Sequence, residues 1–162
     1  MGNRWENIIL HCSDSSYGNA VMIDEWHRKR GWSKIGYHYV ITNGHYFGNS
    51  KYNGLFDGNI EAGRNLDFDT WAEKNEIGAH AIGMNRNSIG LCMIGKKKFT
   101  DAQFAMQSRL IKFLIANIDS LSIDRIYGHY QIESGKEQGK TCPNYDVPNY
   151  VNEYIRGGGA PV

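Results

Sequence analysis

Runs of apolar residues predict several β-strands along the chain. Residues 7–12, NIILHC, are apolar and rich in β-branched side chains, which is typical of a buried strand. Strand alternation would place His11 on one face of this strand and Cys12 on the other. Residues 88–95, SIGLCMIG, form a continuous apolar run that indicates a central strand. Shorter strands are expected at residues 36–42, 59–64 and 125–129.

Helical periodicity and end signals predict helices between these strands. Asn19 can cap a helix over residues 20–30. Thr100 and Gln103 form a capping box for the longest helix, residues 104–118, in which the apolar positions share one face. Shorter helices are expected within residues 67–76 and 146–155.

The alternation of strands and helices, with no internal repeat and no linker, favours one α/β domain. We expect a central mixed β-sheet flanked by helices over residues 1–155, followed by a flexible tail at residues 156–162, RGGGAPV. Residues 43–59 are rich in glycine, asparagine and aromatic side chains and have no helical period. This segment is therefore predicted to be a long hairpin excursion or rim loop.

Composition and charge restrict the possible partners. The 18 basic and 17 acidic residues leave a net charge of +1, which gives no global field to attract nucleic acid, so no nucleic-acid partner is expected. No apolar run has the length of a membrane span, and the first residues lack the apolar core of a signal peptide. We therefore expect a soluble monomer, made in the cytoplasm and not inserted into a membrane.

Two histidines and a cysteine that are distant in the sequence are candidate zinc ligands. His129 and Cys142 are the first and last residues of the stretch HYQIESGKEQGKTC, and His11 lies near the end of the first predicted strand. Zinc prefers neutral imidazole and thiolate ligands, and three protein ligands leave one tetrahedral position open, as in catalytic sites. Lys140 could place its ammonium over that position, and Tyr37 could orient a water molecule there.

Other candidate residues have simpler explanations. His27 is expected to pack or form hydrogen bonds on its helix, and His38 alternates away from the predicted site into a supporting or core position. Cys92 is expected to be a small core residue. The segment SGKEQGKT is similar to a phosphate-binding loop, but Ser134 stands where that pattern requires glycine.

Seven short motifs occur in an order that is typical of one family. They are HCS at 11–13, WH at 26–27, GYH at 36–38, EAGR at 61–64, GAHAIGMNRNSIG at 78–90, GH at 128–129 and KTCPNYD at 140–146. The set closely resembles the type 2 N-acetylmuramoyl-L-alanine amidases, above all the short amidase-type endolysins of bacteriophages. These enzymes share a fold with animal peptidoglycan recognition proteins, and the resemblance covers nearly the whole chain.

The resemblance implies a zinc amidase that cuts the bond between N-acetylmuramic acid and L-alanine in bacterial peptidoglycan. It implies three zinc ligands, namely His11, His129 and Cys142. It also implies a catalytic pair, Tyr37 and Lys140, and two residues near the substrate groove, His80 and Asn85. We expect an endolysin of a phage or prophage, held in the host cytoplasm and acting on the cell wall after release.

The chain departs from the family pattern in two places, and other functions stay open. The residues ESGKEQG lengthen the segment between the second histidine and the cysteine, and the excursion at residues 43–59 suggests a remodelled groove wall. The alternatives are a recycling amidase, an exported antibacterial effector and a non-catalytic peptidoglycan-binding module. Non-catalytic relatives typically lack the thiol, and a closed structural zinc site would need a fourth ligand, for which Cys12 faces the wrong way.

Overall fold

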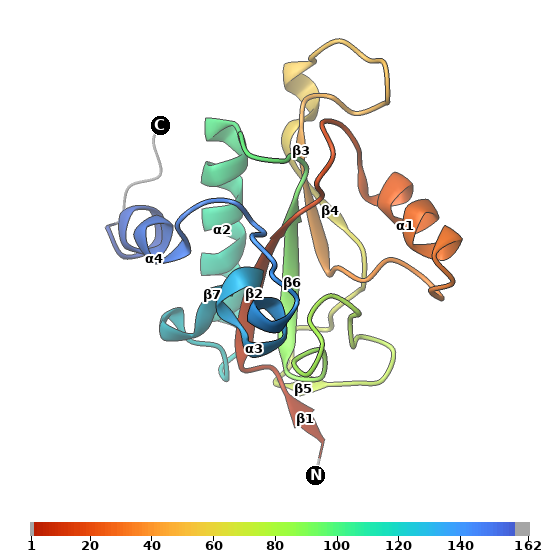
Figure 1. The fold of residues 1–162 in the computed structure, drawn as a ribbon. Helices are drawn as coiled ribbons and strands as arrows, with labels where there is room; N and C mark the ends of the chain where they lie inside the picture. Colours follow the sequence, from red (N-terminus) through yellow and green to blue (C-terminus); the bar gives the residue numbers. More distant parts are fainter. Residues whose placement is uncertain (1, 158–162) are drawn as a thin grey trace.

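A five-stranded mixed sheet organises the molecule, and its strand order is β4-β3-β6-β2-β7 (Figure 1). The computed structural model describes residues 2–157. β3, β6, β2 and β7 run parallel to one another, while the edge strand β4 pairs antiparallel with β3. The prediction of a mixed sheet with residues 88–95 at its centre is therefore confirmed. The strands are β2 (Asn7–Cys12), β3 (Tyr39–Asn43), β4 (Asp57–Ala62), β6 (Ser88–Met93) and β7 (Ile126–Gly128).

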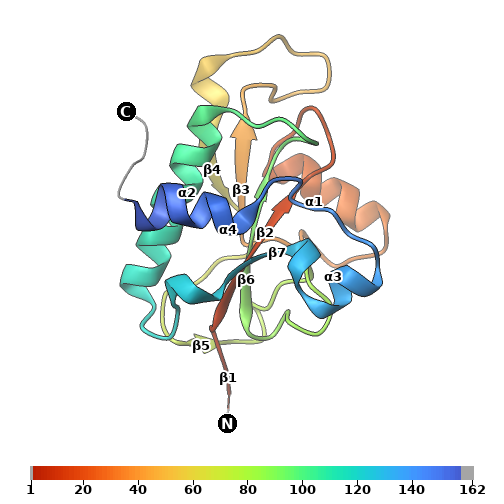
Figure 2. The ribbon, with the colours of Figure 1, turned by 60° about the vertical axis from the view of Figure 1, so that its left-hand side comes forward.

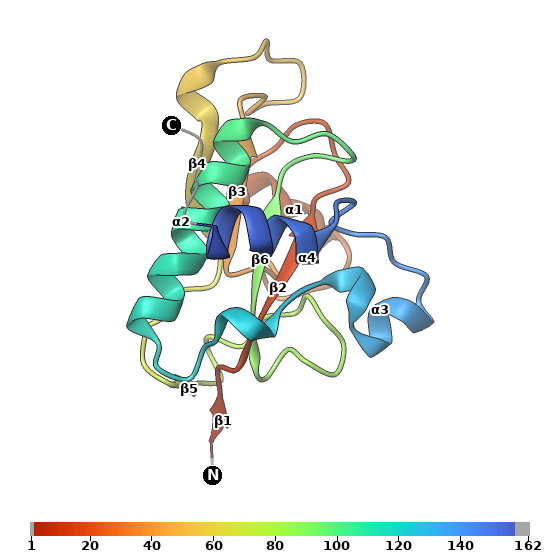
Figure 3. The ribbon, with the colours of Figure 1, turned by 90° about the vertical axis from the view of Figure 1, so that its left-hand side faces the viewer.

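Helices cover both faces of the sheet (Figures 1 and 3). α2 (Asp101–Asn117) and α4 (Val147–Tyr150), which continues as a π-helical turn over Val151–Arg156, pack on the main core. α1 (Ala20–Lys29) packs on the opposite face in a smaller apolar cluster. Along β2, Ile8 and Leu10 face the main core, so Ile9 and His11 face the other side.

Two capping residues place the long helices as predicted. Asn19 Oδ1 accepts a hydrogen bond from Met22 N at 2.9 Å, and Thr100 and Gln103 form a capping box. The buried Gln103 amide also donates to Ile41 O at 3.1 Å and to Ile94 O at 2.8 Å. These two bonds join the first turn of α2 directly to β3 and to the residue that follows β6.

The prediction of a helix within residues 67–76 is wrong. β5 (Trp71–Ala72) instead pairs antiparallel with β1 (Asn3–Arg4). Asp67 Oδ1 accepts a bond from Asp69 N at 2.9 Å, and Asp69 Oδ1 accepts one from Trp71 N at 2.6 Å. Such local bonds from side chain to backbone compete with helix formation.

The remaining segments include one helix that was not predicted. α3 (Glu133–Glu137) lies between the candidate ligands at 129 and 142, and 3₁₀ turns occupy Ile123–Arg125 and His129–Gln131. The segment 43–59 is a hairpin excursion as predicted, with a 3₁₀ turn at Gly54–Phe56. Arg156, the first residue of the predicted tail, belongs to the π-helical turn, and residues 158–162 of that tail lie outside the described part. Within residues 2–157, every helix is too short or too polar to cross a membrane.

Candidate active site

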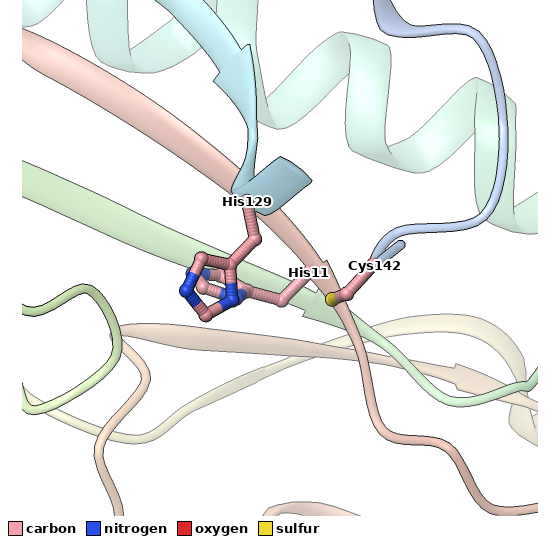
Figure 4. Close-up of side chains that lie close together, drawn as sticks. All are labelled: His11, His129 and Cys142. Atoms are coloured by element: carbon pink, nitrogen blue, oxygen red, sulfur yellow. The ribbon is translucent and has the colours of Figure 1, made fainter. Parts of the chain in front are cut away.

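Adjacent parallel strands bring the two candidate histidines together. His11 lies on β2, and His129 directly follows β7, which pairs with β2. Their ring centroids are 4.8 Å apart. Cys142 arrives from the segment after α3 and is held by a hydrogen bond from Tyr130 N to Cys142 O at 3.0 Å. Figure 4 shows the three side chains gathered at one place.

The predicted trio converges as a candidate metal centre. One ligand atom from each of His11, His129 and Cys142 lies within 4.8 Å of the other two. Atoms that share one tetrahedral zinc ion lie roughly 3.3 to 3.8 Å apart, given bonds of about 2.0 Å to nitrogen and 2.3 Å to sulfur. The donor set and its spacing therefore fit a zinc ion after small side-chain rotations. Within residues 2–157, no other group of three such side chains meets this criterion.

The local environment keeps the two imidazoles in the protonation state that binds metal. Burial holds the pKa of His11 well below its usual value, and the neighbouring His80 and His129 lower it further. Burial also lowers the pKa of His129, with a further contribution from Lys140. Both imidazoles are therefore neutral at neutral pH, as metal binding requires. The Cys12 amide donates to Cys142 Sγ at 3.0 Å, whereas a hydrogen bond with the Cys12 thiol and burial raise the pKa of Cys142. The Cys142 thiol would therefore lose its proton when it binds metal.

His80 lies behind His11. His11 Nε2 and His80 Nδ1 are 2.9 Å apart, and His80 Nε2 lies 3.2 Å from Ser88 O. Burial lowers the pKa of His80 to about 4. Because both ring nitrogens bond within the protein, the structure offers no free nitrogen on His80 for the predicted contact with substrate. Asn85 supports this segment, since its Oδ1 accepts bonds from the amides of His80 and Ala81 at 2.8 Å each.

A groove of about 660 Å³ opens over the trio. Tyr37 is half-buried in it, with its ring centroid 5.1 Å from that of His11, and burial holds its pKa well above the usual value. Lys140 is exposed at the rim, and its amide donates to Gly135 O at 2.8 Å. Figure 2 shows the chain leaving α3 and passing the end of β2 before it enters α4.

Sequence reasoning missed several residues of the groove wall. Arg30, Trp32, Ile82 and Gln138 line it. Trp32 is 39% exposed and Ile82 is 68% exposed, which is unusual for large apolar side chains. The sequence carried a weak signal for Trp32 only, because it follows the predicted end of a helix and belongs to no apolar run.

The three simpler explanations are confirmed. Nδ1 of His27 accepts a bond from Gly36 N at 3.0 Å. His38 is buried, accepts from Gly90 N at 2.9 Å and donates to Glu76 O at 2.9 Å. Cys92 is fully buried.

The mixed sheet, the open groove and the His-His-Cys trio define an α/β protein with a candidate metal-dependent hydrolase site. The chain belongs to the N-acetylmuramoyl-L-alanine amidase family, whose sequence profile matches residues 1–145. It is 30% identical to the endolysin of Enterobacteria phage T3 over 154 residues, which cover 90% of this chain and 84% of that one.

Solved structures with lower identity share the fold. The amidase LysC from Clostridium intestinale is 23% identical and has a TM-score of 0.65, over 93% of this chain and 85% of that one. The bumblebee peptidoglycan recognition protein PGRP-SA is 22% identical and has a TM-score of 0.67, over 96% of this chain and 87% of that one. These likenesses support the expected amidase and recognition-protein architecture.

Proposed function

We propose that this protein is a zinc-dependent endolysin that hydrolyses the amide bond between N-acetylmuramic acid and L-alanine in peptidoglycan. The observation that carries the proposal is the convergence of His11, His129 and Cys142 at the floor of an open groove. Membership of the amidase family supports the reaction, and similarity to the endolysin of phage T3 supports the biological role.

The three converging side chains would hold the zinc ion and leave one side of it facing the groove. When bound, zinc supplies a Lewis acid that polarises the carbonyl oxygen of the scissile amide. The amide of Cys12 stabilises negative charge on the Cys142 sulfur through its 3.0 Å hydrogen bond. The backbone N–H of Ser13, next in the chain, donates a hydrogen bond to Met93 O at 3.0 Å, which keeps the end of β2 in register with β6.

Tyr37 and Lys140, which both line the groove, would act on the substrate. Because the pKa of Tyr37 is raised, its hydroxyl keeps its proton at neutral pH and can donate a hydrogen bond to the attacking water or to the carbonyl oxygen. The Lys140 ammonium would stabilise the negative charge that develops on that oxygen. Asn85, whose carbonyl oxygen is already used, would present its amide nitrogen to the glycan or the stem peptide.

Digestion of purified sacculi tests the proposal. Mass spectrometry should detect glycan with free lactyl carboxyl groups together with stem peptides that begin at a free L-alanine. The His11→Ala variant should release neither product and should bind less zinc, measured by elemental analysis. Cleavage at a sugar or peptide linkage, or full activity after removal of metal, would contradict the assignment. Binding to sacculi without any product would indicate a recognition module instead.

A further inference from the structure

We infer that His80 is a positioning residue that fixes the tautomer of His11 and turns its Nδ1 toward the metal. The inference rests on the proposed zinc site and deepens it. Resemblance to the amidases suggested a contact between His80 and substrate. The hydrogen bonds of His80 instead indicate that it supports His11, a candidate zinc ligand. His80 is 8% exposed, lines the groove and contacts His11 Nε2 through its Nδ1.

A backbone carbonyl determines the direction of the hydrogen bonds. Ser88 O can only accept, so His80 Nε2, at 3.2 Å, must carry the hydrogen. His80 is buried and has no carboxylate among its hydrogen-bond partners in residues 2–157, so its ring is neutral and its Nδ1 is an acceptor. His11 Nε2, at 2.9 Å from that atom, is then the donor, and His11 Nδ1 keeps a free lone pair.

Two glycines make room for the His80 ring. A Cβ atom on Gly90 would lie 2.6 Å from His80 Cγ, and one on Gly78 would lie 2.8 Å from His80 Cδ2. The ring therefore rests against bare backbone on β6 and on the segment before it. At the main chain, His80 N donates to Asn85 Oδ1 at 2.8 Å. The His80 ring stands at 89° to that of His11, and its Nδ1 lies 2.9 Å from His11 Nε2.

This arrangement specifies one coordination mode for His11. A second partner on the non-ligating nitrogen fixes the tautomer and ring orientation of a metal-binding histidine, and loss of such a partner typically lowers metal affinity by about 10- to 100-fold. In many sites a carboxylate has this role. Here a second imidazole has it, and the chain of bonds ends on a backbone carbonyl, so no charge is buried behind the ligand.

Zinc affinity of three variants, measured by competition with a chromophoric chelator, tests the inference. His80→Leu keeps most of the volume but has no acceptor, so its affinity should fall about 10- to 100-fold. His80→Asn places Oδ1 near the lost Nδ1, so its affinity should stay within about threefold of wild type. His27→Leu is the matched control: it removes an imidazole that is 6% exposed and accepts a backbone bond, but touches no candidate ligand, so zinc affinity should be unchanged.

Nitrogen chemical shifts provide a second test that needs no variant. In zinc-free wild-type protein, long-range proton–nitrogen spectra should show His11 and His80 both with hydrogen on Nε2. A His80 ring with hydrogen on Nδ1, or equal zinc affinity in wild type and a folded His80→Leu, would overturn the inference. These results leave the proposed function intact, since that function fails only if wild type binds no zinc or releases no amidase products.

Discussion

Among single residues, Lys140 is placed so that its ammonium can act at the groove. It is exposed at the rim, yet its charge contributes to the lowered pKa of both His11 and His129. Its backbone is held to Gly135 O at 2.8 Å, so the ammonium starts from a fixed point beside the groove. An exposed amine so placed can reach a substrate oxygen without paying for burial of its charge.

Replacing Lys140 with alanine should reduce turnover and leave zinc binding unchanged. Removing one donor to a developing oxyanion typically costs about 3 to 4 kcal/mol of barrier, so kcat should fall by about 100- to 1,000-fold. Lys136→Ala, on the exposed side of α3, is the matched control and should keep wild-type turnover. Loss of metal together with activity in Lys140→Ala would make this lysine a scaffold residue.

Residue types revealed the trio, but not the support behind it. Histidine and cysteine are the residue types that bind zinc, which made His11, His129 and Cys142 candidates, and the resemblance to the amidases implied them as the ligand set. The surroundings of His80 depend on the Ser88 carbonyl and on the missing side chain of Gly90, neither of which is apparent before β6 is placed in the sheet.

At the scale of elements, α3 determines the shape of the segment between His129 and Cys142. A Cβ atom on Gly135 would lie 1.7 Å from His129 O, so this helix crosses the backbone of a candidate ligand at a distance that only glycine permits. The helix spans five residues, too few to display a helical period, and for that reason sequence reasoning treated it as a loop. The reverse error concerns residues 67–76, where Asp67 and Asp69 accept hydrogen bonds from backbone amides two residues further on, a local arrangement that competes with a helix.

Gly135→Ala should therefore displace α3 and disturb the metal centre. Overpacking of this kind typically costs about 1 to 3 kcal/mol, and we expect a matching fall in the urea midpoint together with weaker zinc binding. Ser134→Ala is the control in the same helix. The Ser134 hydroxyl is buried without a hydrogen-bond partner in residues 2–157, so its removal should be neutral or slightly stabilising. Equal urea midpoints of Gly135→Ala and Ser134→Ala would show that α3 accommodates the added methyl group without loss of stability.

At the scale of the whole molecule, the sheet and its covering helices followed from sequence because local and global signals agree. Continuous apolar runs form β2 and β6, and the capping box at Thr100 begins α2 where predicted. The structure also buries imidazoles more widely than sequence could reveal. Five of the six histidines have a pKa lowered by burial, namely His11, His27, His38, His80 and His129.

Burial of neutral histidines should make the zinc-free protein sensitive to acid. The folded pKa of His27 lies below the ordinary value of 6.5, so the stability that it contributes above pH 6.5 is lost as pH falls below that value. His27→Asn keeps an acceptor for Gly36 N and cannot titrate. The free energy of unfolding, measured with urea between pH 7.5 and 5.5, should fall less steeply with pH in this variant than in wild type. The difference in slope should be up to about 1.4 kcal/mol per pH unit. The same pH dependence of the free energy of unfolding in both proteins would refute the expectation.

The hydrogen bond between Tyr130 N and Cys142 O closes residues 131–141 into a loop anchored at both ends. An excursion anchored in this way can change in length or sequence while its terminal cysteine stays in place, provided that a glycine remains where the helix crosses the His129 carbonyl. Ile132 is buried against Ile9 and Ala81, so the exchangeable part is residues 136–139, which are exposed beside a fixed reaction centre. Recombination between related genes, or a protein engineer, can use this division to alter which wall fragments enter without rebuilding the chemistry.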